Sequence, residues 1–446
     1  MIPNLKKHIN LNQTKITTDQ RGCGQAKTVG YIYPLVEQLN NISTPTLIIC
    51  PSINLCEQYH HRFPNARLIT SKTCERTTGS VIEAMKDQEK IIIATHETFL
   101  MLPDIEYLKQ KYFLVIDEAL LIYKKSPILR NTPHLTYDWA NIFDHNNVRD
   151  DEYVLLKQKL SHNDANPGLS KELVKMITSP NHDFYLEYND YDAMMNQMEK
   201  PFVINALLNH QLFVGWVGIH IAAADFDNTS MGALFKKYQI NYSTLFDFER
   251  HRFNLKIHTI RDAKWSKSKQ KHNSDIIEKY NRYVIDNRQD TPILSLRNIN
   301  NKSQLANEYQ LSHNSHGLNR PEYKSCRDFL LEAAILPDND FKSFLLNQLF
   351  GLDKVNRLDD DPVLLMHCVY SYYQAIMRSW LRDSKYNNEL VQIFCYDSEI
   401  AGLLGHYFEV DVENYIELDR EQFGFRKPAM TGAERKRLHR ERNKNK

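Results

Sequence analysis

The residue types best suited to phosphate chemistry lie in one short glycine-rich stretch near the start of the chain. It reads Arg21-Gly22-Cys23-Gly24-Gln25-Ala26-Lys27-Thr28. Successive backbone N–H groups followed by a helix N-terminus can surround phosphate oxygens, and glycines let the backbone approach them closely. In such a loop Lys27 would reach the outer phosphates, and the Thr28 hydroxyl would ligate Mg²⁺. We therefore predict that residues 22–28 bind a nucleotide.

This stretch departs from the common phosphate-loop pattern at two positions. Ala26 stands where the pattern has glycine, and Arg21 replaces its first glycine. Alanine adds a methyl group at a crowded point of the loop. Taken alone, the stretch fits a plain turn before a helix as well as it fits a phosphate loop, so the rest of the chain must decide between the two.

A pair of acids gives the loop a candidate partner. Asp117-Glu118-Ala119 follows an apolar run at 112–116 that reads as a buried strand. Adjacent acids after a strand are often only a solvated turn or a helix N-cap. Beside a phosphate loop, Asp117 would hold Mg²⁺ directly or through water, and Glu118 would polarise the attacking water.

The elements that would position these residues alternate between strands and helices. Short apolar runs that predict strands lie at 46–50, 90–94 and 112–116, and a short β-branched segment at 15–18 predicts another before the glycine-rich loop. The alternation predicts an α/β fold with a mainly parallel sheet. Ligands of such sheets bind beyond the carboxyl ends of the strands. Four candidate site residues follow predicted strands: Gly24, Ser52, Thr95 and Asp117.

Length and composition set further bounds. A chain of 446 residues predicts two or three domains, and a net charge of +1 indicates that any surface for nucleic acid must be local. The 7 cysteines are scattered without a CxxC pair, which argues against a disulfide framework or a zinc site. We see no signal-peptide core and no apolar run long enough for a membrane, and we expect a cytoplasmic protein, in the host cytoplasm if viral.

In the order and rough spacing of these motifs, the sequence resembles the superfamily-two helicases, the DEAD-like nucleic-acid-dependent ATPases. Residues 24–28 resemble the family's first motif, and residues 117–119 resemble its acid box. The resemblance implies ATP and Mg²⁺ as cofactors. It also implies contacts to the nucleic-acid backbone from two segments, which contribute the candidates Ser52, Gln58, Thr95 and His96.

Further segments resemble the later motifs of this family. Residues 219–224 resemble the third motif loosely, and Ser315-His316-Gly317-Leu318-Asn319 resembles the fifth, with Ser315 a nucleic-acid contact. Residues 374–378 resemble the sixth motif. Gln374 and Arg378, with Arg382 after them, would complete the ATP site from a second lobe. Their four-residue spacing predicts one shared helix face.

The resemblance implies two recombinase-like (P-loop) lobes with parallel sheets. We expect residues 1–122 and 213–262 to form the first lobe and residues 263–425 the second. Residues 123–212, which interrupt the first lobe, predict an inserted, mainly helical subdomain, with one helix near Val154 and Leu155 and another near Leu173 and Ile177.

Two basic segments are candidate contacts to nucleic acid. The loop at 264–271 contains Lys264 and Trp265, which suggests a phosphate contact with a stacking ring or else a solvated linker. The basic C-terminal tail, residues 426–446, would bind phosphates or only aid solubility.

The leading hypothesis is an ATP-dependent helicase or translocase that acts on single-stranded or partly duplex nucleic acid, with DNA preferred. The sequence is similar in style to helicase-like proteins of phages and plasmids, which implies a role in replication beside other replication proteins. One alternative is a viral DNA-packaging terminase with a nuclease centre at Asp225, Asp227 and Asp397. Another is a nucleotide-dependent DNA-binding module that does not hydrolyse ATP.

Overall fold

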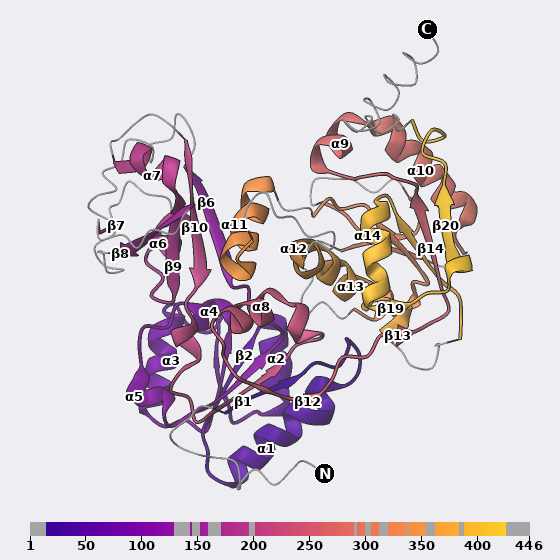
Figure 1. Ribbon diagram of the computed structural model, residues 1–446. Coiled ribbons are helices and arrows are strands. Elements are labelled where there is room, and N and C mark those ends of the chain that lie inside the picture. The colour runs from indigo at the N-terminus through magenta and orange to yellow at the C-terminus, as the bar shows by residue number, and fades with distance from the viewer. Residues whose placement is uncertain are drawn as a thin grey trace. The chain divides into compact units, whose positions relative to one another are not determined.

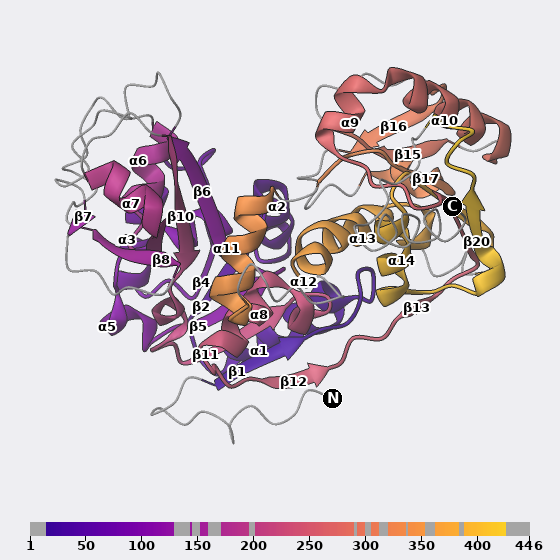
Figure 2. The ribbon, with the colours of Figure 1, turned by 45° about the horizontal axis from the view of Figure 1, so that its top comes forward.

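Figures 1 and 2 show the computed structural model of the chain. It describes residues 15–128, 143–144, 152–158, 171–195, 201–289, 292–298, 305–311, 320–335, 338–352, 362–382 and 388–424. The chain divides into two compact units. Unit 1 comprises residues 1–248 and 338–363, and unit 2 comprises residues 249–337 and 364–446.

Unit 1 is built on a parallel sheet of seven strands in the order β12-β1-β11-β5-β2-β4-β3. The strands are β1 (Lys15–Asp19), β2 (Thr46–Cys50), β3 (Arg67–Ile69), β4 (Ile91–Thr95), β5 (Phe113–Asp117), β11 (Gly218–Ala222) and β12 (Ser243–Phe246). β2 and β5 are buried along their whole length, as central strands of a parallel sheet must be when helices cover both faces.

The helices of this α/β layer connect the strands along the chain. They are α1 (Tyr33–Asn41), α2 (Ile53–Arg62), α3 (Thr77–Lys86), α4 (His96–Leu100), α5 (Glu106–Lys109) and α8 (Ser230–Lys237). A short π-helical turn, η2 (Thr28–Ile32), joins the predicted phosphate loop to α1. The predicted α/β class with parallel sheets is confirmed.

The insertion in unit 1 is an antiparallel sheet, so the prediction of a mainly helical subdomain was wrong. Its order is β6-β10-β9-β8-β7. The elements are β6 (Tyr123–Ile128), β7 (Phe143–Asp144), β8 (Tyr153–Gln158), β9 (His182–Glu187), β10 (Phe202–Leu208), α6 (Lys171–Ile177) and α7 (Tyr188–Met195). Only α6 matches a predicted helix. Val154 and Leu155 lie in β8, because a short apolar run fits a buried strand as well as a helix.

Helix α11 (Asn339–Phe350) comes late in the chain yet packs on this insertion, as Figure 1 shows. Its Phe341 ring stacks on Tyr123 with centroids 4.0 Å apart. Phe344, which is fully buried, meets Tyr153 at 5.3 Å and Tyr185 at 5.5 Å. The structure thus groups residues 338–363 with unit 1, whereas the sequence division placed them in the second lobe.

Unit 2 has a parallel sheet of six strands in the order β16-β15-β17-β18-β14-β20. These are β14 (Leu255–Ile260), β15 (Ile293–Leu296), β16 (Glu308–Leu311), β17 (Asp328–Leu331), β18 (Val391–Cys395) and β20 (Tyr415–Leu418), and β13 (His251–Arg252) pairs separately with β19 (Phe408–Glu409). Because β14 lies inside this sheet, unit 2 begins at residue 249 rather than at 263.

The described helices of unit 2 are α9 (Lys267–His272), α10 (Ser274–Asn287), α12 (Pro362–Leu364, whose first two residues are grouped with unit 1), α13 (Tyr370–Ile376) and α14 (Ser398–Leu403). A π-helical turn, η7 (Leu365–Val369), links α12 to α13. In the part of the chain that the structure describes, no helix combines the length and apolar character needed to cross a bilayer.

Candidate functional site

The glycine-rich stretch forms a tight loop between β1 and η2. Gln25 closes it, because its Oε1 accepts the Gly22 N–H at 2.8 Å while its own N–H reaches the Gly22 carbonyl at 3.3 Å. Gly24 has φ 82° and Ala26 has φ 55°, both in the left-handed region. That region is unfavourable by roughly 1–2 kcal/mol for a residue with a Cβ. Ala26 therefore occupies a backbone conformation that glycine would adopt without strain.

Lys27 points back into this loop. Its side chain is buried, with 8% of the residue exposed. The Nζ donates to the Arg21 carbonyl at 2.8 Å and to the Gly22 carbonyl at 3.3 Å. The ammonium group therefore lies among the backbone groups of the loop, where the sequence placed the phosphate-binding lysine.

Arg21, the other unusual loop residue, neutralises a buried acid. Its Nε and Nη2 donate to the two carboxylate oxygens of Asp19 at 2.9 and 2.6 Å. Asp19 is fully buried at the end of β1, and a buried carboxylate needs such a partner. Arg21 thus stabilises the entrance to the loop at the position where the common pattern has glycine.

Asp117 ends β5 and faces the loop. Its Oδ2 accepts hydrogen bonds from the Tyr59 hydroxyl at 2.7 Å and from Thr28 Oγ1 at 3.4 Å. Its backbone carbonyl lies 2.9 Å from His96 Nε2. The fold thus brings together Thr28 and Asp117, which the sequence predicted as a pair.

Burial raises the pKa of the Asp117 carboxyl to about 6, and the negative charge of Glu118 adds to the effect. The hydrogen bond from Tyr59, the charge of Lys27 and the hydrogen bond from Thr28 oppose it. A positive ion beside this carboxylate would favour its charged form in the same way.

Glu118 follows in a left-handed conformation, with φ 67°. Its N–H donates to the Ala222 carbonyl at 3.0 Å. Ala222 ends β11 and pairs with both Asp19 and Asp117. The segment that loosely resembled the third motif therefore lies between the strand that leads to the phosphate loop and the strand that carries the acids.

Tyr59 is a site residue that the sequence analysis did not identify. The ring is fully buried in α2 between Tyr33 and the sheet. Helical spacing with Cys56 indicates an inward-facing position. The partner of its hydroxyl could not be found from spacing, because Asp117 lies 58 residues further along the chain.

The candidate nucleic-acid contacts of unit 1 lie at the same edge of the sheet. Ser52 follows β2 and Thr95 ends β4, and each hydroxyl accepts a backbone N–H at a helix start, from Leu55 and Thr98 respectively. Gln58 is exposed on α2. Contact with nucleic acid stays a prediction for these residues and for His96.

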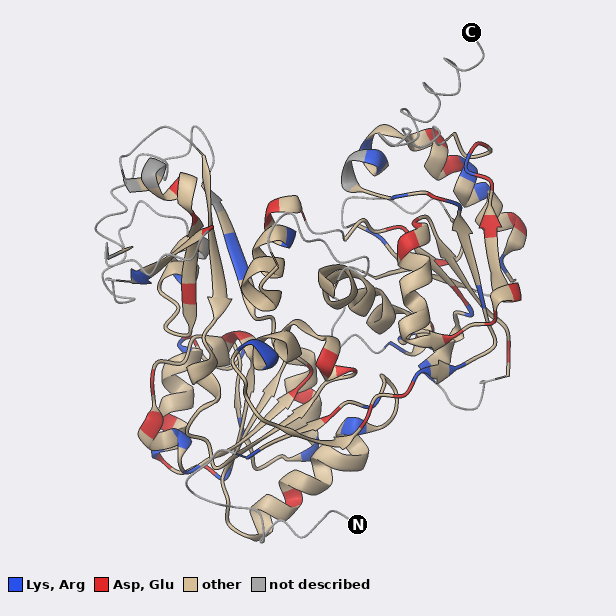
Figure 3. Cartoon of the chain, in the orientation of Figure 1, with Lys and Arg blue, Asp and Glu red and all other residues tan. Residues whose placement is uncertain are grey.

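Positive and negative residues are interspersed on each unit, so charge alone marks no binding face among the described residues (Figure 3).

In unit 2, the expectation that Trp265 stacks on a base was wrong. Its ring is 3% exposed and stacks on Tyr396 with centroids 4.4 Å apart. Its Nε1 donates to the Glu332 carbonyl at 2.9 Å. Lys264 beside it is exposed and pairs with Glu399 at 3.2 Å. Residues 267–271 of the predicted basic loop lie in helix α9.

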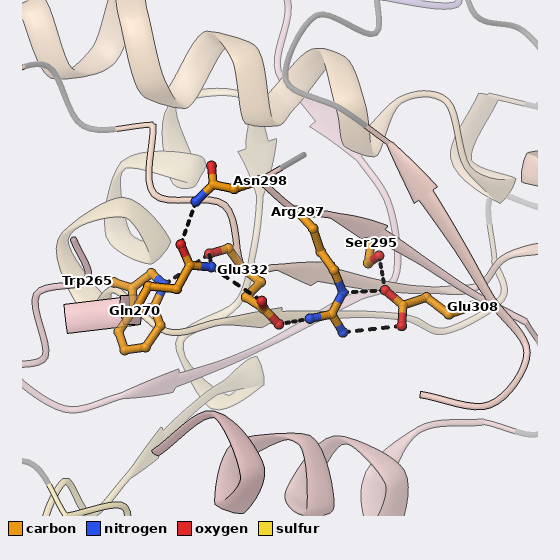
Figure 4. A network of polar contacts seen from close by, with 7 residues as sticks. All are labelled: Trp265, Gln270, Ser295, Arg297, Asn298, Glu308 and Glu332. Carbon is orange, nitrogen blue, oxygen red and sulfur yellow. Dashed lines mark hydrogen bonds and ion pairs between the residues drawn. The ribbon is translucent and has the colours of Figure 1, made fainter. Parts of the chain in front are cut away.

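Trp265 borders a buried polar network, shown in Figure 4. At its centre Arg297, which follows β15, forms ion pairs with Glu308 and Glu332. Both carboxylates are essentially unexposed. Further hydrogen bonds come from Ser295 to Glu308, from Gln270 to Glu332 and from Asn298 to Gln270. The network ties strands β15, β16 and β17 together.

The residues predicted to form the sixth motif do not share a helix face. Helix α13 ends at Ile376. Gln374 is buried within it, Arg378 lies in the turn after it, and Arg382 lies in a following 3-10 turn, η8 (Trp380–Arg382). The expectation of one continuous helix was therefore wrong, and a role of these residues in ATP hydrolysis stays a prediction. Ser315 and the basic tail lie outside the described residues.

The acids proposed for a terminase nuclease have structural partners. Asp225 accepts from Asn228 Nδ2 at 3.0 Å, and Asp227 accepts from the Tyr242 hydroxyl. Asp397, in unit 2, caps α14. Among the residues that the structure describes, no group of three or more histidine, cysteine and acidic side chains is arranged to hold a metal ion.

Comparison with known families finds a match within unit 1. Residues 14–131 match the family described as DEAD/DEAH box helicase. No curated protein matches the sequence.

Solved helicase structures resemble the fold at low sequence identity. "Structure of S. tokodaii Xpd4" covers 93% of this chain and 98% of its own, with 12% identity and a TM-score of 0.50. "XPD_Helicase" covers 94% and 100%, with 12% identity and a TM-score of 0.49. A single-substitution variant of S. cerevisiae Dbp5, bound to RNA and ADP BeF3, covers 92% and 86%, with 10% identity and a TM-score of 0.39.

The family match spans both the phosphate loop and the acid pair, and it confirms the predicted resemblance and the prediction of an enzyme. Residues 14–131 are thus similar to a DEAD/DEAH box helicase domain, and the fold of the whole chain is similar to that of a solved helicase structure.

Proposed function

We propose that the chain binds and hydrolyses ATP with Mg²⁺ at Lys27, Thr28, Asp117 and Glu118, and that hydrolysis drives translocation along DNA or its unwinding. One observation carries this proposal. The Thr28 hydroxyl lies 3.4 Å from the buried Asp117 carboxylate, directly after the loop into which Lys27 points. A plain turn before a helix would not require this convergence of a hydroxyl, a carboxylate and an amine.

The residues present fit a magnesium ion. Hydroxyl and carboxylate oxygens, with water, are ligands that Mg²⁺ prefers. Thr28 and Asp117 would hold the ion, which would supply positive charge next to the phosphates. Asp117 Oδ2 already accepts two hydrogen bonds, whereas no described residue donates to its Oδ1. Oδ1 is therefore the oxygen of Asp117 best placed to face the ion or its water.

Lys27 and Glu118 would act on the phosphates and on water. The Lys27 ammonium bonds two neutral carbonyls of the loop, and phosphate oxygens would be stronger partners for it. The Glu118 backbone is fixed on Ala222 at the end of the central strands. Its carboxylate would orient the attacking water by accepting a proton from it.

Nucleic acid would cross the edge of the sheet that carries Ser52, Thr95 and His96. His96 contacts the Asp117 carbonyl at 2.9 Å, so a nucleic-acid contact at the start of α4 would be one residue away from the ATP site. We propose DNA as the preferred substrate and replication of a phage or mobile element, beside other replication proteins, as the setting.

ATP hydrolysis by the full chain, measured with and without single-stranded DNA or RNA, tests the proposal. We expect DNA to stimulate turnover more than RNA, and Lys27→Ala and Glu118→Gln each to lower kcat at least ~100-fold. Matched controls are Lys86→Ala and Glu83→Gln, which change exposed residues of α3.

Several outcomes would count against the proposal. Activity unchanged by both site variants would show that the site is elsewhere. ATP binding without turnover would indicate a non-hydrolysing DNA-binding module. Strand displacement on a tailed duplex separates a helicase from a translocase, and metal-dependent DNA cleavage without ATP would favour the terminase alternative.

A further inference from the structure

An exposed aromatic ring lies beside the phosphate loop. Phe246 ends β12, the edge strand next to β1, and 39% of it is exposed. Its carbonyl accepts the Gln20 N–H at 2.8 Å, so the strand end is fixed directly to the residue that precedes Arg21. Figure 2 shows β12 running along this edge of the sheet. The Tyr31 ring meets Phe246 edge-on, with centroids 5.6 Å apart, and supports it from the side.

The guanidinium of Arg21 lies over this ring. Its central carbon is 4.2 Å from the Phe246 centroid. The bidentate ion pair with Asp19 fixes the plane of the guanidinium and uses Nε and Nη2. No described residue accepts a hydrogen bond from Nη1. The cation is one residue from Gly22, and a quarter of its side chain is exposed.

A fixed guanidinium over an aromatic ring is a surface on which a nucleobase can stack. Arginine planes and aromatic rings both stack on bases, whatever the base sequence. A nucleotide whose phosphates occupy the adjacent loop must direct its base to some neighbouring surface. Among the described residues that flank the loop, Phe246 supplies an exposed aromatic surface, and the Nη1 group of Arg21 supplies an N–H donor with no described acceptor.

We propose that Arg21 and Phe246 form the platform for the base of the bound nucleotide, with Nη1 donating to the base or the ribose. A purine is the expected base, because its larger ring covers more of the platform. This inference rests on the proposed ATP site. It gives a role to Arg21 beyond neutralising Asp19, and it explains why a bulky side chain stands at the position where the common loop has glycine.

Binding of three ligands to the full chain, measured by calorimetry, separates base recognition from phosphate recognition. The ligands are ATP, CTP and inorganic tripolyphosphate. We expect Phe246→Leu, which keeps an apolar side chain, to weaken ATP binding ~10-fold and to leave tripolyphosphate binding unchanged. Arg21→Lys, which keeps the charge but not the plane, should have the same selective effect. Tyr107→Leu is the matched control, because Tyr107 is an exposed aromatic on α5, before the amino end of β5.

Each outcome is decisive. Equal weakening of ATP and tripolyphosphate by Phe246→Leu would mean that the ring only supports the loop, and no weakening of either would also overturn the platform. A wild-type chain that binds CTP as tightly as ATP would overturn the purine preference. Lys27→Ala should abolish binding of all three ligands. If it changes none of them, the proposed ATP site itself is wrong, which is a different result from failure of the platform.

Discussion

The Tyr59 hydroxyl donates a 2.7 Å hydrogen bond to Oδ2 of Asp117, and both residues are buried. This bond sets the orientation of the carboxylate that we propose as a magnesium ligand, because it occupies Oδ2 and leaves Oδ1 for the ion. It also lowers the pKa of Asp117, whereas burial raises it. Tyr59 is therefore a positioning residue for the acid box, supplied by the helix that follows the neighbouring strand.

Substitution of Tyr59 by phenylalanine should raise the Mg²⁺ concentration needed for half-maximal ATP hydrolysis by about tenfold, since a hydrogen bond to a charged group contributes about 1.5–3 kcal/mol. The kcat at saturating Mg²⁺ should change less. Tyr33→Phe is the control, because Tyr33 packs edge-on against Tyr59 and its hydroxyl is not among the described donors to Asp117. Equal Mg²⁺ requirements in the two variants would show that the hydrogen bond serves only packing.

The two left-handed residues of the phosphate loop predict opposite effects of reciprocal substitutions. Ala26→Gly removes the strain at φ 55° but makes the unfolded chain more flexible, which offsets part of the gain. The free energy of unfolding should therefore rise by about 0.5–1 kcal/mol. Gly24→Ala, at φ 82°, should lower it by about 1 kcal/mol. Chemical denaturation measures both. A stabilising Gly24→Ala would contradict the loop conformation.

The parts of the fold that local patterns specify could be predicted from the sequence. Uniformly apolar runs such as 46–50 and 112–116 predict buried parallel strands, and polar residues after them identify the edge of the sheet that carries the site. The pairing of Thr28 with Asp117 followed from this rule, because parallel strands end at one edge.

Features that depend on distant partners could not be predicted. Trp265 in a run of lysines resembles a surface aromatic, and only its partners Tyr396 and Glu332 show that it is buried. The strand β8 and helix α11 have apolar residues whose partners lie far along the chain. Arg21 was identified as a departure from a motif, while its position over Phe246 required the structure.

His220 predicts how unit 1 responds to acid. It is fully buried in β11, and its Nδ1 lies 3.0 Å from Thr17 Oγ1. Burial lowers its pKa to about 4 from an ordinary value of 6.5, the charge of Arg21 adds to this, and Asp19 opposes it. Between these two values the unfolded chain binds more protons than the folded one. The free energy of unfolding should therefore fall as the pH falls from about 6.5 to 4, by up to about 1.4 kcal/mol per pH unit.

Comparison with His220→Gln isolates this effect, because the variant lacks the titrating group. In denaturant titrations, lowering the pH from 7.5 to 5 should reduce the free energy of unfolding of the wild-type chain more than that of the variant. His61→Gln, at an exposed position of α2, serves as the control. A difference that stays constant over this range would show that His220 titrates as it does in the unfolded chain.

The network around Arg297 predicts a large effect from one substitution and a smaller one from three. Arg297→Met leaves Glu308 and Glu332 buried without their counter-ion and should destabilise unit 2 by about 3–5 kcal/mol. Adding Glu308→Gln and Glu332→Gln removes the unpaired charges and should restore part of that loss. If the triple variant is no more stable than Arg297→Met in urea unfolding, charge burial is not the cause.

The packing of α11 on the insertion predicts which elements lose stability when a core residue of that helix is truncated. Phe344→Ala removes the ring that meets Tyr153 and Tyr185 and should cost about 3–5 kcal/mol locally. Because α11 is grouped with unit 1 although its flanking chain enters unit 2, amide protection should fall in α11, β6 and β8 and stay unchanged in β15 and β17. Hydrogen exchange measures this amide protection, and Ser343→Ala, a substitution in the same helix, is the control. Loss of protection in β15 and β17 instead would mean that α11 is an integral part of unit 2, and that its contacts with the aromatic residues of the insertion contribute little to its stability.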